Sequence, residues 1–194
     1  MDKVKNTFLI SPDDVKAGSY INYNVDDSML APAIREASDI HLQAIIGSNL
    51  YYRLQELVYN HIMGAPDSID DNDNALYKEL LDDYVHPYLT MKTQAVLCLP
   101  ISIKIRNYGL AKDGDTNINQ AQLSEVMASQ TRYNTVAAKY ATQLSKYLCL
   151  HKQDFPELEE TSCGCGLFIP AVLGKTFVET GLVLGTTENG CNCC

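Results

Sequence analysis

Five of the seven cysteines lie near the C-terminus of the chain, as a Cys-Gly-Cys pair and a Cys-Asn-Cys-Cys run: Cys163, Cys165, Cys191, Cys193 and Cys194. Thiolates from two such groups are sufficient ligands for a tetrahedral structural Zn²⁺ site, which would stabilise a segment with little core of its own. The one-residue spacing is less typical of zinc sites than a two-residue spacing. Free thiols, a zinc site and disulfides therefore stay open as alternatives.

The other two cysteines, Cys98 and Cys149, lie in apolar helical surroundings, so we expect buried thiols that act as small hydrophobic side chains. The total of seven is odd, and no N-terminal stretch has the form of a signal peptide, which argues against a secreted disulfide framework. The apolar runs are also too short for a membrane span. We expect a protein that is cytosolic, or one that is assembled in the cytosol.

The four histidines are His41, His61, His86 and His151, and none belongs to a catalytic motif. His41 lies within the apolar stripe of a predicted helix, so we expect a hydrogen-bonded core histidine. The sequence contains no HExxH, no GxSxG and no glycine-rich phosphate loop. We therefore expect that the protein is not an enzyme, and we assign no catalytic, cofactor-binding or metal-ligating residue.

Residues 65–74 (APDSIDDNDN) form an acidic loop whose four aspartates suggest calcium ligands. The loop lacks the glycine and the terminal glutamate of an EF-hand, so a helix-capping loop is the preferred interpretation. The whole chain of 194 residues has a formal net charge of −9 and a pI of about 4.8. This charge argues against a protein that grips nucleic acid through phosphate contacts.

Residues 26–64 predict an αα-hairpin, two amphipathic helices separated by Gly47. Asp26, Asp27 or Ser28 is expected to cap the first helix, and Ser48 or Asn49 the second. The predicted apolar faces consist of Met29, Leu30, Ala33, Ile34, Ala37, Ile40, His41, Ala44 and Ile45 in the first helix and Leu50, Tyr51, Leu54, Leu57, Val58 and Ile62 in the second.

A third helix is predicted from about Asn74 to Pro100, kinked at His86-Pro87, with Leu76, Leu80, Leu81, Tyr84 and Val85 on its apolar face. The alternation of Ile101, Ile103 and Ile105 with polar residues predicts a small β-hairpin over about 101–115. A long helix follows, from 117–120 to about His151, with a possible break near Ser129.

Three tyrosines lie seven residues apart along the predicted long helix: Tyr133, Tyr140 and Tyr147. The preferred interpretation is a core face whose phenol oxygens reach the surface. The alternative is a tyrosine strip that packs on a neighbouring subunit.

The predicted fold class is therefore mainly α, a helical bundle built on the αα-hairpin and a long C-terminal helix. The predicted division is a helical domain over 1–158, with the short β insertion, and a β-type cysteine-rich arm over 159–194, which contains GLFIPAVL (166–173) and KTFVETGLVL (175–184).

Four sequence stretches carry a resemblance: FLISPDDVK, VDDSMLAPAIREASDIHLQAIIGSNLYYRL, LPISIKIRNYGL and QTRYNTVAAKYATQLSKYLCLHKQDFPEL. In this order they resemble the head–tail connector (adaptor, or neck ring) proteins of tailed bacteriophages, and look closest to the ring proteins of crAss-like phages of gut Bacteroidetes. The resemblance spans about Phe8 to Leu158 and leaves out the cysteine-rich arm.

The resemblance implies a structural virion protein that forms a ring, typically of twelve copies, on the portal of the capsid. The ring would extend the DNA channel and dock the next tail component. It would be located in the virion neck, and in the host cytoplasm during assembly, without contact to a membrane. Genomic DNA would pass through its lumen without specific binding, which the acidic charge favours. The alternative is a cysteine-rich zinc-binding or thiol-redox module.

Overall fold

The computed structural model describes residues 4–21, 23–106, 109–112 and 123–158, and these are mainly helical, which confirms the mainly-α fold class. The cysteine-rich segment 159–194 lies outside the described residues. The elements are η1 (Val4–Asn6), α1 (Pro12–Ala17), α2 (Asp27–Glu36), π-helical η2 (Ala37–Leu42), α3 (Gln43–Ile46), α4 (Ser48–Met63), η3 (Asn72–Asn74), α5 (Ala75–Glu79), π-helical η4 (Leu80–Val85), α6 (His86–Ser102), β1 (Ile103–Arg106), β2 (Gly109–Lys112), α7 (Leu123–Leu150) and η5 (Pro156–Leu158).

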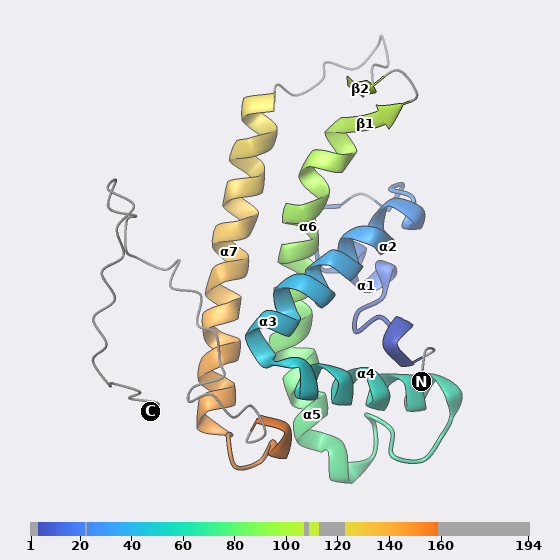
Figure 1. Ribbon diagram of the computed structural model, residues 1–194, viewed down its shortest axis with the longest axis vertical. Coiled ribbons are helices and arrows are strands. Elements are labelled where there is room, and N and C mark those ends of the chain that lie inside the picture. The colour runs from blue at the N-terminus through green and yellow to red at the C-terminus, as the bar shows by residue number, and fades with distance from the viewer. Residues whose placement is uncertain (1–3, 22, 107–108, 113–122, 159–194) are drawn as a thin grey trace, which may run out of the picture.

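The centre of the molecule is the antiparallel pair of α6 and α7, which lie side by side along the long axis (Figure 1). On its other sides α6 contacts α2, η2 and α1, while α4 crosses one end of the bundle (Figure 1). The largest fully buried side chains form one continuous core: Leu30, Ile34, Leu42, Ile46, Leu50, Leu54, Leu57, Leu80, Leu89, Leu144, Leu148 and Phe155.

The caps of the predicted αα-hairpin are partly as expected. The Asp26 carboxylate accepts a hydrogen bond of 2.9 Å from the backbone N–H of Ser28, which confirms the predicted N-cap. Gly47 has φ = 82° and ends the first helix, where a side chain would be strained. Gly47 also holds the N-cap position of α4, so the expected cap by Ser48 or Asn49 is wrong. The Ser48 hydroxyl instead accepts a hydrogen bond from the Gln43 amide.

The predicted apolar face of the first helix is wrong over 40–44, because η2 is π-helical. A π turn holds more residues than an α turn, so the side chains that follow it are rotated about the helix axis. The buried positions are Ala37 and Ser38, then Leu42, then Ile45 and Ile46, while Ile40 is 61% exposed and Ala44 is exposed.

The third predicted helix is one continuous helical run from Ala75 to Ser102, in which π-helical η4 ends at Val85, two residues before Pro87. The expected end by Pro100 is wrong, since α6 continues for two more residues. A proline near the end of a helix removes only one backbone hydrogen bond there. β1 and β2 then pair antiparallel, with Ile103 opposite Lys112.

The long helix α7 runs without a break through Ser129, so the predicted break is wrong; its predicted start at 117–120 lies outside the described residues. Tyr147 packs in the core with its ring stacked on that of Tyr84, the centroids 4.2 Å apart. The hydroxyl of Tyr147 is itself buried, against the expectation that all three phenol oxygens reach the surface. Tyr133 and Tyr140 are half-buried.

We expect Leu144→Ala to lower the free energy of unfolding by about 2–5 kcal/mol, because the side chain is fully buried in the core and its removal leaves a cavity. Urea denaturation at neutral pH measures this change. Leu150→Ala on the exposed face of the same helix is the matched control and should change stability by less than about 0.5 kcal/mol. Equal effects of the two substitutions would contradict the packing described for α7.

Candidate functional site

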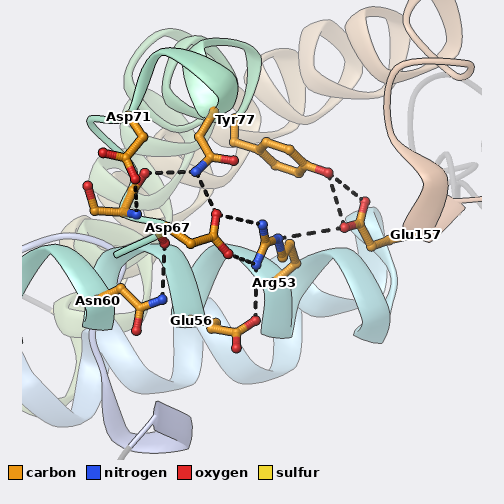
Figure 2. Close-up of polar contacts among 9 residues, drawn as sticks. Arg53, Glu56, Asn60, Asp67, Asp71, Tyr77 and Glu157 are labelled. Carbon is orange, nitrogen blue, oxygen red and sulfur yellow. Dashed lines mark hydrogen bonds and ion pairs between the residues drawn. The ribbon is translucent and has the colours of Figure 1, made fainter. Parts of the chain in front are cut away.

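The most connected polar group among the described residues surrounds Arg53 on α4, and Figure 2 shows it. The Arg53 guanidinium donates two hydrogen bonds to the Asp67 carboxylate, of 2.9 and 3.1 Å, and one of 3.2 Å to Glu56. Its Nε lies 3.9 Å from Glu157. Such a two-pronged pairing fixes direction as well as distance, because the planar guanidinium matches the carboxylate. We call Arg53, Glu56, Asp67, Asn74, Tyr77 and Glu157 the Arg53 cluster.

Asp67 organises the acidic loop around this contact. Its backbone has φ = 59°, an uncommon value for a residue other than glycine. Asn74 donates hydrogen bonds to the Asp67 carboxylate and to the Ser68 carbonyl, and Asn60 donates to the Asp67 carbonyl (Figure 2). The hydrogen bonds from Arg53 and Asn74 lower the pKa of Asp67. The loop is thus held in one conformation.

On its other side the Arg53 cluster holds the last described turn of the chain. The Tyr77 hydroxyl donates to the Glu157 carboxylate at 3.0 Å, and its ring packs edge-on against Phe155. Burial and the hydrogen bond to Glu157 raise the pKa of Tyr77 to about 12. The cluster therefore fixes the point from which the chain continues into residues 159–194.

Two further aspartates of the acidic loop, Asp70 and Asp71, also have protein partners. Asp70 accepts a hydrogen bond of 2.6 Å from Lys78 and lies 2.9 Å from the His61 ring, and Asp71 accepts one from the Ser68 backbone N–H. Within the described part of the chain no three acidic, histidine or cysteine side chains are grouped as metal ligands. Asp71 and Asn74 hold the N-cap positions of η3 and α5, but neither side chain accepts a capping hydrogen bond, so the predicted helix-capping loop is confirmed in position only.

A groove of about 700 Å³ lies between the N-terminal segment, the end of α4 and η4. We call it the α4 groove. Leu9, Ile69 and Leu81 lie buried at its floor, while Ile62 and Met63 at its edge are 62% and 58% exposed. Ile62 was expected on the apolar core face of its helix, as was Leu76, and both expectations are wrong.

A second, smaller hollow of about 270 Å³ lies near the end of α6. It is lined by Tyr20, Ile21, Val25, Gln94, Leu97, Cys98, Ile101 and Tyr133. Burial raises the pKa of the Cys98 thiol, which makes it a poor nucleophile. Cys98 and Cys149 were expected to be buried, but both are half-buried.

The four histidines make different contacts. His41 is half-buried and forms no hydrogen bond with a described residue, so the expected hydrogen-bonded core position is wrong; burial and the nearby Lys92 lower its pKa. His86 donates from Nε2 to the Leu9 carbonyl at 2.8 Å, and His151 lies 2.9 Å from Asp154. His61 and His86 both line the α4 groove together with Ser11, but the Ser11 hydroxyl donates to Asp14 and the two rings contact Asp70 and the Leu9 carbonyl instead. No nucleophile–base pair forms among these described residues, and we assign no catalytic site.

The Arg53 cluster and the α4 groove were missed by sequence analysis. Arg53 and Asp67 are 14 residues apart, and only the reversal of the chain after α4 brings them together. The available signal was the loop composition, since asparagine and aspartate favour turns with side-chain-to-backbone hydrogen bonds.

Comparison with known proteins places the chain in a family. The described residues define a mainly helical protein with apolar hollows. The model of a family described as a family of unknown function (DUF6712) matches residues 42–166, more than half of the chain, and the chain belongs to this family. No curated protein and no solved structure matches the chain. No helix among the described residues is long and apolar enough to cross a membrane.

We expect Arg53→Gln to lower the free energy of unfolding by about 1 kcal/mol at pH 7, because the pairing is two-pronged but partly exposed to solvent. A carboxylate whose pKa is lower in the folded than in the unfolded protein stabilises the folded state at pH values above its unfolded-state pKa. This stabilisation is lost as the pH falls through the folded-state pKa. The difference between wild type and variant should therefore shrink below about pH 4.

Urea denaturation at pH 7 and at pH 3 measures both effects. Glu56→Gln removes only an exposed ion pair and is the control, with an expected change within about 0.5 kcal/mol. A difference between wild type and Arg53→Gln that stayed constant from pH 7 to pH 3 would contradict the role of the Asp67 carboxylate.

Proposed function

We propose that the protein is a structural virion subunit, a head–tail connector that forms a ring on the portal of a tailed bacteriophage. The sequence resemblance over about 8–158 motivates this function. The ring would extend the DNA channel and dock the next tail component, and the net charge of −9 would keep phosphates from binding in the lumen. The acidic charge is compatible with a protein that acts through shape and association.

The observation that carries the proposal is a set of exposed apolar side chains near the end of α6 and the start of α7. Figure 1 shows this end of the bundle. Tyr20 is 77% exposed and lines the hollow near the end of α6, with its ring 6.4 Å from that of Tyr133. Tyr23, three residues further along the chain, is 68% exposed. Ile101, Leu123 and Met127 are also exposed. Aromatic side chains and methionine are enriched in protein interfaces, so this end suits a partner subunit.

The β-type segments would extend this role. Strands β1 and β2 follow α6 at the same end, and the cysteine-rich arm 159–194 follows α7 in the chain. An arm that adds a strand to a neighbour's exposed edge would link copies in a ring. This function of the two segments is a hypothesis from their composition.

We expect the wild-type protein to decorate purified cognate portals as a ring in electron micrographs, and Tyr20→Ser/Tyr23→Ser to bind at least about tenfold more weakly. The reason is that truncation of an interface aromatic side chain costs about 1–2 kcal/mol or more. Leu150→Ser, which replaces another exposed apolar side chain at the far end of α7, is the matched control and should bind normally. The absence of any ring on portals, or catalytic turnover abolished by a point substitution, would overturn the proposal.

The second candidate function is a cysteine-rich zinc or thiol-redox module, which the crowding of Cys163, Cys165, Cys191, Cys193 and Cys194 favours. The connector function requires no zinc, so we expect elemental analysis of the full-length protein to find no stoichiometric zinc. We also expect thiol titration in denaturant to find all seven cysteines reduced. Stoichiometric zinc that is lost together with folded structure on chelation would favour the second function.

A further inference from the structure

The α4 groove presents apolar surface that the described residues leave uncovered. Its floor is closed by buried Leu9, Ile69 and Leu81, and half-buried Phe8 and Val58 widen the apolar surface. Ile62 and Met63 stand exposed at its edge. An apolar hollow bordered by neighbouring exposed apolar side chains is typical of a site that is covered by another segment or partner.

The charges around the α4 groove already have partners. Lys78 and His61 both contact Asp70, Ser11 donates a hydrogen bond to Asp14, and the His86 ring lies 3.6 Å from Asp82. Asp14, Asp70 and Asp82 outnumber Lys78 around the groove, so an occupant with carboxylates would be repelled, and any charged occupant would lose hydration against the apolar side chains. The groove therefore suits an uncharged apolar segment.

Such a segment follows the last described residue of the same chain. Residues 166–173 read GLFIPAVL and carry no charged side chain. Pro170 lacks a backbone N–H and favours an extended conformation for the residue before it, which suits binding in a groove without a helix.

The distances permit this binding. The Arg53 cluster holds Glu157, and Ile62 lies nine residues beyond Arg53 on α4, about 14 Å along the helix axis. Residue 166 is eight residues after Leu158, and an extended chain of that length spans up to about 26 Å. The Arg53 cluster thus anchors the chain within reach of the α4 groove.

We propose that residues 166–173 bind in the α4 groove of the same chain and cover Ile62 and Met63. The proposal does not depend on the connector function, because it concerns how one copy of the protein covers its own apolar surface. It gives the Arg53 cluster a specific role as the anchor that sets the starting point of this segment.

The test is photo-crosslinking in the full-length protein. A benzophenone amino acid replaces Met63, the protein is diluted until it is monomeric, and the crosslinked peptides are identified by mass spectrometry. We expect crosslinks to 166–173 of the same chain. The same amino acid in place of Leu150, which is exposed on α7, is the control for random collisions and should not label 166–173.

Two substitutions in the C-terminal region sharpen the test. Phe168→Asp should reduce the Met63 crosslink about tenfold, because a carboxylate is costly to bury in an apolar groove. Leu182→Asp makes the same change in the second apolar run, 182–184, and should leave the crosslink unchanged. Both positions lie outside the described helical core, and circular dichroism checks that each variant retains its helices.

The other outcomes overturn the proposal. Crosslinks to residues 1–3 would show that the N-terminus covers the groove. Crosslinks between copies, detected by mixing isotope-labelled and unlabelled protein, would show that the occupant is a second copy. Absence of any crosslink, or equal loss in Phe168→Asp and Leu182→Asp, would show that 166–173 does not occupy the groove.

Discussion

The packing of α6 against its neighbours is the interaction on which the rest of the structure depends. α6 contacts α7 along its length and also contacts α2, η2 and α1. Its buried residues therefore point in several directions, and they include polar Thr93 and Gln94 beside Leu89 and Leu97. On α7, Ala137 and Ala141 face this core, and small side chains let helices approach closely. The α4 groove and the hollow near the end of α6 both depend on the pair of α6 and α7.

Polar contacts attach the peripheral segments to that core. Gln55 on α4 donates hydrogen bonds to the Thr7 carbonyl and to the Tyr51 hydroxyl, which itself donates to Asp39 on η2. His86 binds the Leu9 carbonyl, so the N-terminal segment is held from two helices. The Arg53 cluster does the same for the acidic loop and the last described turn. The α4 groove exists because these contacts place three separate segments around one hollow.

Helical periodicity predicted the existence of the long helices, since buried apolar side chains recur at the spacing of a helix face. It failed at Ile40 and Ala44, because a π-helical segment shifts the buried face and has no recognisable signal in residue type. Ile62 and Leu76 were misplaced for another reason: they continue an apolar pattern into positions where no described segment covers them. The Arg53 cluster depends on the fold of the loop, which local sequence does not specify. Cap residues such as Asp26 and Gly47 were predictable, since their conformations are decided locally.

Native-state hydrogen exchange tests most directly whether α6 and α7 form one cooperative unit. If each helix is stable only through the other, the amides of 88–97 and 137–148 should exchange through global unfolding alone, with the same free energy of opening and the same dependence on denaturant. The acidic loop and the turn at η5 should open at lower free energy. A distinctly lower free energy of opening for α7 than for α6 would contradict the account.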